Sequence, residues 1–132
     1  MKKVFINGCF DILHVGHIRL FEYAKMFGDK LIIGIDSDER VKSLKGDSRP
    51  FNKQEDRKEM LLSIKYVDNV CIFNDKIELE NLVFNISPDY MIVGNDYKNK
   101  EVIGSDFAKK LIFFDKVNGY STTKILQNTT TG

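Results

Sequence analysis

Two histidines three residues apart are the side chains of this chain best suited to chemistry. His14 and His17 are the only histidines in the sequence, and Gly16 lies between them. An imidazole can donate hydrogen bonds to phosphoryl oxygens, and it adds positive charge when it is protonated. The glycine argues against pure packing, because glycine is useful where the backbone approaches a ligand closely. The pair therefore predicts a phosphate-binding site.

Two other interpretations of the pair remain open at this point. A metal site would need more ligands, but the chain has no third histidine, and Cys9 and Cys71 are far apart without metal-ligand spacing. A structural pair is the second alternative, since a buried histidine usually serves only to satisfy hydrogen bonds. We expect no metal held by protein side chains.

The segments on either side of the histidines predict where they lie. Residues 3–7 have the pattern of a strand, and residues 17–27 that of a helix ended by Gly28 and Asp29. In an open α/β sheet, ligands bind beyond the carboxyl ends of the strands. The start of a helix offers unpaired N–H groups and a partial positive charge, which suit a phosphate.

The same alternation of strand and helix patterns continues along the chain. Further strands are predicted at residues 30–35, 69–73, 90–93 and 111–114. Residues 36–52 are predicted to form a loop or a short irregular helix. Helices are predicted after Asn52, as an N-cap with Glu55 as its capping-box partner, before Pro88, weakly at residues 104–110, and after Ser121 as an N-cap. Alternating elements of this kind predict a parallel, doubly wound α/β sheet with right-handed crossovers.

Several polar segments follow the predicted strands, so we expect them to meet at one edge of the sheet. They include residues 94–97 and 119–123, and four cations: Lys45, Arg49, Arg57 and Lys65. Four cations beside two helix starts describe a site for a polyanion such as a nucleoside triphosphate.

Length and composition set the class of protein. A chain of 132 residues makes one domain, predicted at residues 1–127, with a disordered tail at 128–132. A formal net charge of +1 gives no general case for binding nucleic acid or membranes. No apolar run approaches membrane-spanning length. Two unmatched cysteines and the absence of a signal segment predict a cytoplasmic protein.

The motifs resemble those of a known superfamily. The segment Gly8-x-Phe10-Asp11-x-x-His14-x-Gly16-His17 is similar to the signature of the HxGH nucleotidyltransferases, and residues 121–123 resemble their second, phosphate-binding motif. The resemblance covers residues 3–127 and is to the cytidylyltransferase-like branch. It implies a single-domain, Rossmann-like fold of the HUP type and a nucleotidyltransferase activity.

Within that branch, two enzyme families are similar to this chain. Residues 44–57, 94–97, 102–104 and 119–123 look like those of heptose 1-phosphate adenylyltransferases, although Asn95 replaces their usual glycine. Glycerol-3-phosphate cytidylyltransferases typically have Arg-Thr-Glu where this chain has Lys116-Val117-Asn118. The resemblance therefore implies ATP and D-glycero-D-manno-heptose 1-phosphate as substrates, giving ADP-heptose. CTP with glycerol 3-phosphate or another small phosphate is the alternative, and a catalytically idle nucleotide-binding module is an alternative of another class.

The resemblance also implies roles for individual residues. The catalytic residues would be His14, His17 and Lys45. The nucleotide would be bound by Gly8, Phe10, His14, His17, Gly94, Asp96, Gly119, Ser121, Thr122 and Thr123. The acceptor phosphate would be bound by Asp11, Lys45, Arg57 and Lys65, with Asp11 expected chiefly to order the turn. Mg²⁺ would accompany the NTP, held mainly by phosphate and water oxygens.

Aromatic residues predict a homodimer. The sequence contains many large apolar side chains for one small core: Phe10, Phe21, Phe27, Phe51, Phe73, Phe84, Phe107, Phe113 and Phe114, with five tyrosines. A small domain buries a limited share of its surface, so some of these should lie on a face that needs a partner. Related small nucleotidyltransferases are commonly two-fold dimers, which is the symmetry expected here.

Overall fold

The structure is a computed structural model that describes residues 1–94, 97, 99–115 and, for the backbone alone, 121–125. The predicted tail at 128–132, and with it the end of the predicted domain, lies outside the described residues.

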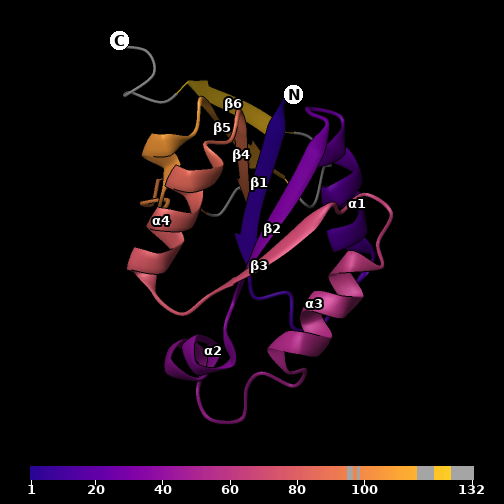
Figure 1. The fold of residues 1–132 in the computed structure, drawn as a ribbon, viewed down its shortest axis with the longest axis vertical. Coiled ribbons are helices and arrows are strands. Elements are labelled where there is room, and N and C mark those ends of the chain that lie inside the picture. Colours follow the sequence, from indigo (N-terminus) through magenta and orange to yellow (C-terminus); the bar gives the residue numbers. More distant parts are fainter. Residues whose placement is uncertain (95–96, 98, 116–120, 126–132) are drawn as a thin grey trace.

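A six-stranded sheet forms the centre of the molecule (Figure 1). Its strands are β1 (Lys3–Gly8), β2 (Lys30–Asp36), β3 (Asn69–Phe73), β4 (Tyr90–Gly94), β5 (Lys110–Phe114) and β6 (Ser121–Ile125). They lie in the order β3-β2-β1-β4-β5-β6. The chain builds the sheet outward from β1 to β3 on one side, then crosses to β4 and β5 on the other. The strand order therefore reverses between β1 and β4, and such a switch point is where doubly wound sheets bind ligands.

The first five strands are parallel, as the alternating pattern of strands and helices predicts. Parallel strands are covered by helices on both faces, and short apolar runs such as residues 31–35 suit that burial. The sixth strand is not parallel. The short helix predicted after Ser121 is wrong: residues 121–125 form β6, antiparallel to β5, with Ser121 opposite Phe114 and Ile125 opposite Lys110. β-Branched threonines favour a strand, and β6 satisfies backbone groups that β5 would otherwise leave unpaired at the sheet edge.

Helices cover both faces of this sheet. They are α1 (Val15–Lys25), α2 (Asp38–Lys45), α3 (Gln54–Leu62), α4 (Lys76–Ile86) and the 3₁₀ turn η2 (Ser105–Phe107). Leu20, Phe21 and Ala24 of α1 and Leu61 of α3 share one core with β1 and β2. Leu79 and Val83 of α4 pack into a second core on the opposite face. No helix in the described part of the chain has both the length and the apolar character needed to span a membrane.

Two helix starts differ from the sequence-based prediction. The segment predicted as a loop or irregular helix contains a regular helix, α2, because the Ser37 hydroxyl caps it by accepting the N–H of Arg40 at 3.2 Å. The capping box predicted for Asn52 and Glu55 is wrong, because the N-cap of α3 is Lys53 and its side chain makes no capping bond. Asn52 is instead engaged by Asp11, as described below.

Candidate active site at the carboxyl edge of the sheet

The turn after β1 brings the two histidines to the edge toward which β1 points. Gly8 ends the strand, and a Cβ atom there would lie 3.0 Å from the Phe10 ring. Phe10 follows with a φ of 51°, in the left-handed region that side chains other than glycine seldom adopt. Its buried ring makes edge contacts with His17 and Phe21, at centroid distances of 5.3 and 5.4 Å. Phe10 thus anchors the turn beneath His17, and backbone outliers of this kind cluster at functional sites.

The two histidines cap the start of α1 reciprocally. His14 is the N-cap, and its Nδ1 accepts the N–H of Gly16 at 3.0 Å. His17 reaches back, and its Nδ1 accepts the N–H of His14 at 3.2 Å. The arrangement is that of a capping box, with imidazoles in place of the usual hydroxyl and carboxylate. Two N–H groups that a helix start leaves unpaired are satisfied in this way.

The capping bonds assign the tautomer of both rings. A nitrogen that accepts a hydrogen bond carries no proton, so a neutral imidazole bonded through Nδ1 carries its proton on Nε2. Nε2 is then the donor atom of each ring. The ring centroids are 4.0 Å apart, so both donors serve one small region beside the helix start. This arrangement suits the oxygens of a phosphoryl group.

Gly16 is required by the close fold of this turn. A Cβ atom at Gly16 would lie 2.7 Å from Cε1 and 2.9 Å from Nδ1 of His14. Any larger residue would push the imidazole away from the N–H that it accepts. The glycine thus permits the capping position of His14.

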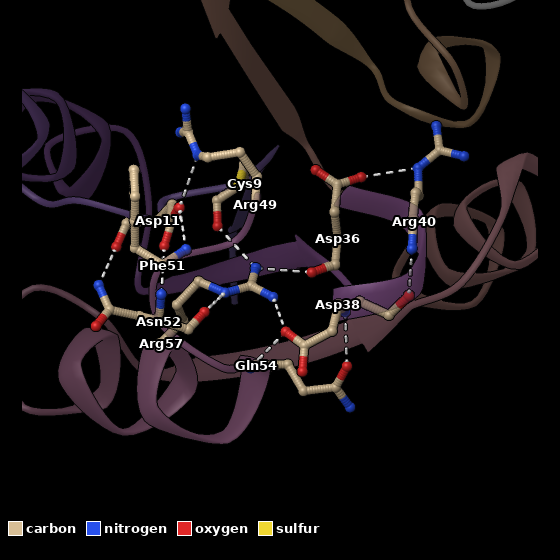
Figure 2. A network of polar contacts seen from close by, with 11 residues as sticks. Cys9, Asp11, Asp36, Asp38, Arg40, Arg49, Phe51, Asn52, Gln54 and Arg57 are labelled. Atoms are coloured by element: carbon tan, nitrogen blue, oxygen red, sulfur yellow. Dashed lines mark hydrogen bonds and ion pairs between the residues drawn. The ribbon is translucent and has the colours of Figure 1, made fainter. Parts of the chain in front are cut away.

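Asp11 holds the loop between α2 and α3 against the histidine turn (Figure 2). Its buried carboxylate accepts the N–H groups of Phe51 and Asn52, each at 2.8 Å, and Nε of Arg49 at 3.2 Å. The Asn52 side-chain amide donates in return to the Asp11 carbonyl. Burial alone would raise the pKa of Asp11, but the N–H donors from Asn52, Phe51 and Arg49 hold the pKa below its ordinary value. Asp11 therefore orders the turn, and its carboxylate is already occupied by the loop.

Arg57 is the buried centre of the same network, and this does not fit its predicted role at an acceptor phosphate. The side chain is 0% exposed. Its nitrogens donate to the carbonyls of Cys9 at 3.0 Å, Asp36 at 2.7 Å and Asn52 at 2.9 Å, and to the Asp38 carboxylate at 2.8 Å. Arg57 thus ties the ends of β1 and β2 to the loop before α3 (Figure 2). A phosphate would reach it only if this network opened.

Sequence reasoning missed a second exchange in the network, between Asp38 and Gln54. The Asp38 carboxylate accepts the N–H of Gln54, and the Gln54 side-chain oxygen accepts the N–H of Asp38, both at 2.8 Å. Each residue is the first of its helix, so α2 and α3 cap one another. The two positions are sixteen residues apart, and no local pattern marks such a pair.

The two lysines predicted for the acceptor site lie at opposite edges of the sheet. Lys45 is the exposed last residue of α2, which lies beyond the end of β1 (Figure 1). Lys65 lies between α3 and β3, next to Tyr66, over whose ring its ammonium group stacks at 5.2 Å. Asp68, three residues on, exchanges hydrogen bonds with the backbone of Leu31 at the start of β2. Lys45 thus lies at the edge toward which β1 points, and Lys65 lies on the side of the sheet where β2 begins.

The remaining predicted nucleotide-binding residues are placed only in part. Gly94 ends β4, next to β1 at the switch point, while Asp96 and Gly119 lie outside the described residues. Ser121, Thr122 and Thr123 belong to β6, where the backbone alone is described. Nowhere in the described part of the chain do three or more His, Cys, Asp or Glu side chains form a group that could hold a metal ion.

Comparisons with known proteins identify the family of the chain. The cytidylyltransferase-like family model matches residues 5–128. The chain is 51% identical over 126 residues to the bifunctional protein HldE of a Nitratiruptor species, covering 96% of this chain and 27% of that protein. It is 49% identical over 123 residues to the bifunctional protein HldE of Campylobacter fetus subsp. fetus, covering 93% of this chain and 27% of that one. The chain thus spans about a quarter of the length of these curated relatives.

A solved structure is also similar to this one. The lipopolysaccharide core biosynthesis protein from Thermoplasma volcanium GSS1 superposes with a TM-score of 0.64 at 27% identity, covering 73% of this chain and 76% of that one. The predictions of a Rossmann-like α/β fold and of a nucleotidyltransferase are thereby confirmed. The chain belongs to the cytidylyltransferase-like family of nucleotidyltransferases.

Proposed function

We propose that this domain transfers a nucleotidyl group from an NTP to a sugar phosphate with release of pyrophosphate, and that its substrates are ATP and D-glycero-D-manno-heptose 1-phosphate. The observation that carries the proposal is the reciprocal cap of His14 and His17. It directs two Nε2 donors to one region at a helix start beside the switch point of the sheet. The similarity to a lipopolysaccharide core biosynthesis protein supports a saccharide acceptor.

The reaction needs little from the protein beyond positioning and charge stabilisation. An anionic oxygen of the sugar phosphate attacks the α-phosphorus of the NTP in line. The bond from that phosphorus to the bridging oxygen breaks, and pyrophosphate leaves with the electron pair. The nucleophile is already deprotonated, so no general base and no covalent intermediate are required.

The residues take their roles from their positions. His14 and His17 donate from Nε2 to phosphoryl oxygens on which negative charge grows. Lys45 meets the α-phosphate or the incoming phosphate. The nucleotide lies along the turn of Gly8 and Phe10 and the β4–β6 side of the sheet, where Gly94, Asp96 and Gly119 and the Ser121, Thr122 and Thr123 segment would bind it.

Mg²⁺ enters this proposal as part of the substrate. The described residues offer no cluster of acidic or imidazole ligands. We therefore expect the ion to arrive bound to the triphosphate, coordinated mainly by phosphate and water oxygens, and to neutralise charge there.

The preference for ATP over CTP rests on residues 116–118, where Lys-Val-Asn replaces the Arg-Thr-Glu typical of glycerol-3-phosphate cytidylyltransferases. The test is a panel of four NTPs against heptose 1-phosphate, other sugar phosphates and glycerol 3-phosphate, followed by pyrophosphate release. Preference for CTP with glycerol 3-phosphate would favour the cytidylyltransferase. Nucleotide binding without any release would favour an idle module.

The predicted homodimer and cytoplasmic location remain proposals. Phe84 and Phe107 are exposed, by 61 and 38%, and form an edge contact at 5.2 Å. These side chains support a partner-covered face, and two free cysteines, Cys9 and Cys71, suit a reducing compartment. Sedimentation equilibrium at micromolar concentration tests the dimer, and a 15.2 kDa species alone would reject it.

A further inference from the structure

Arg49 is a cation at this edge of the sheet that the network holds in place while part of its guanidinium stays exposed. Its Nε donates to the Asp11 carboxylate at 3.2 Å, and its guanidinium carbon lies 4.7 Å from the centre of the Phe51 ring. The side chain remains 32% exposed. Figure 2 shows its two terminal nitrogens pointing away from Asp11, and among the described residues they have no hydrogen-bond partner.

Arg49 and Arg57 differ in how much of the guanidinium group remains able to bind a ligand. Arg57 is buried and its guanidinium is bonded to backbone carbonyls and to Asp38. Arg49 is fixed at one edge by Asp11 and on one face by Phe51, so the outer edge of its guanidinium is oriented and makes no hydrogen bond to the described residues. A guanidinium fork presents two parallel N–H donors that match two oxygens of a phosphate. Orienting the fork beforehand reduces the entropy lost on binding.

The negative charge of Asp11 does not block an anion here. Its carboxylate is 3% exposed and also accepts the N–H groups of Phe51 and Asn52. These donors compensate the charge, and the carboxylate is far less exposed than the Arg49 side chain that it holds. An incoming anion therefore meets the terminal nitrogens of Arg49 first.

The topology indicates which reactant Arg49 faces. Its loop joins α2 to α3 and belongs to the β2–β3 side of β1, whereas Gly94 and residues 121–123 belong to the β4–β6 side. If the nucleotide occupies the β4–β6 side, as proposed above, the second reactant must approach from the side of Arg49. Lys45, at the start of the same loop, adds a second positive charge there.

We propose that Arg49 binds the phosphate of the sugar-phosphate acceptor, held ready for it by Asp11 and Phe51, in the place that the sequence assigns to Arg57 and Lys65. This proposal rests on the proposed function for the identity of the acceptor. The recognition itself is a bidentate contact between a guanidinium and a phosphate monoester, and it can be measured without turnover.

The binding test uses the four arginines of the chain, Arg19, Arg40, Arg49 and Arg57, whose Nε–H signals are observable by NMR in the 132-residue protein. The Arg49→Lys variant identifies the Arg49 signal. Mannose 1-phosphate should shift that signal saturably and leave Arg57 unchanged, whereas mannose should shift neither. A non-hydrolysable ATP analogue alone should leave the Arg49 signal in place. No shift with mannose 1-phosphate, or an equal shift with the ATP analogue, would overturn the assignment.

Kinetics provide the second test. Arg49→Lys and Arg49→Gln should raise KM for the sugar phosphate by about tenfold or more, as expected when a charge-assisted pair is lost, with KM for ATP and kcat within about twofold. Lys30→Gln removes one positive charge at the opposite edge of the sheet and serves as the matched control. A lowered melting temperature with an unchanged KM for sugar phosphate would show that Arg49 is only structural. If the wild type released no pyrophosphate with any substrate, the proposed function would fail while the NMR titration still decided the role of Arg49.

Discussion

The imidazole rings of His14 and His17 lie 4.0 Å apart at an angle of 34°, and each uses Nδ1 to accept a backbone N–H of the turn that carries them. One pair of bonds therefore caps a helix, sets the tautomer of both rings and turns both Nε2 donors to the same region. The sequence leaves open whether His14 and His17 have a structural role or bind phosphate, and the two roles need not exclude one another. In this turn Nδ1 of each ring has the structural role, and the proposed contact with phosphate is made through Nε2.

Replacing His17 by alanine should reduce kcat by about a hundredfold or more, as expected when one preorganised donor to a developing negative charge is lost. The loss of its capping bond should lower the free energy of unfolding by about 1 kcal/mol, so the protein should remain folded. Steady-state pyrophosphate release and urea unfolding measure the two effects. Near-normal turnover by folded His17→Ala would rule out a catalytic role.

Gly16→Ala tests the fold of the turn without removing a donor. Its Cβ atom would overlap the His14 ring, so the imidazole should leave the N–H of Gly16, and kcat should fall by about tenfold, a part of the full loss of one donor. A crystal structure of the variant should show the displaced ring. Gly46→Ala is the matched control, because nothing lies within 4 Å of a Cβ atom at Gly46, although its φ of 101° makes some loss of stability expected there too. Unchanged activity in Gly16→Ala would mean that the capping position of His14 is dispensable.

Asp11→Asn should weaken the acid dependence of stability. Burial raises the pKa of Asp11, but the N–H groups of Asn52 and Phe51 and the Arg49 side chain outweigh it and hold the pKa below its ordinary 3.8. Ionised Asp11 therefore stabilises the fold above that pH. This stabilisation is lost as the pH falls through the lowered pKa. Asp68 and Asp89 also have lowered pKa values and should contribute in the same range.

The measurement is urea unfolding of wild type and Asp11→Asn between pH 7 and pH 3. The variant should be less stable at pH 7, and the difference should begin to shrink below about pH 4, where Asp11 of the unfolded chain takes up a proton before Asp11 of the folded protein does. A difference that stays constant down to pH 3 would contradict the assigned role of the charge.

Substitution by glutamine should impair the reaction at Lys45 but not at Lys65. Lys45→Gln should raise KM or lower kcat by about tenfold, because it removes a cation near the reacting phosphates. Lys65→Gln should leave both values within about twofold, because Lys65 stacks on Tyr66 near the start of β2. Pyrophosphate release at varied sugar phosphate distinguishes them. A loss in Lys65→Gln equal to that in Lys45→Gln would restore the sequence-based assignment.

Local sequence patterns predicted the parallel strands and the histidine turn because their causes are local. Apolar runs such as residues 31–35 suffice for buried strands, and a strand followed by a short turn and a helix places His14 and His17. α2 is less evident, because Val41 is its buried residue and one apolar position gives little periodicity.

The errors arise where contacts distant in sequence decide the structure. β6 depends on pairing with β5, which outweighs the N-cap preference of Ser121. Arg57 is buried by the carbonyls of Cys9, Asp36 and Asn52, and backbone carbonyls leave no signature in a sequence. The sequence pattern predicts Asn52 as a helix cap, but Asp11, forty-one positions earlier, binds it instead.

The most direct test of the account follows ³¹P NMR of the purified protein with MgATP and D-glycero-D-manno-heptose 1-phosphate, beside matched samples that contain MgCTP or the His17→Ala variant. The account predicts pyrophosphate and the diphosphate signals of ADP-heptose in equal amounts with ATP, much slower formation with CTP, and almost none with His17→Ala. Faster product formation with CTP, or equal rates in wild type and His17→Ala, would contradict it.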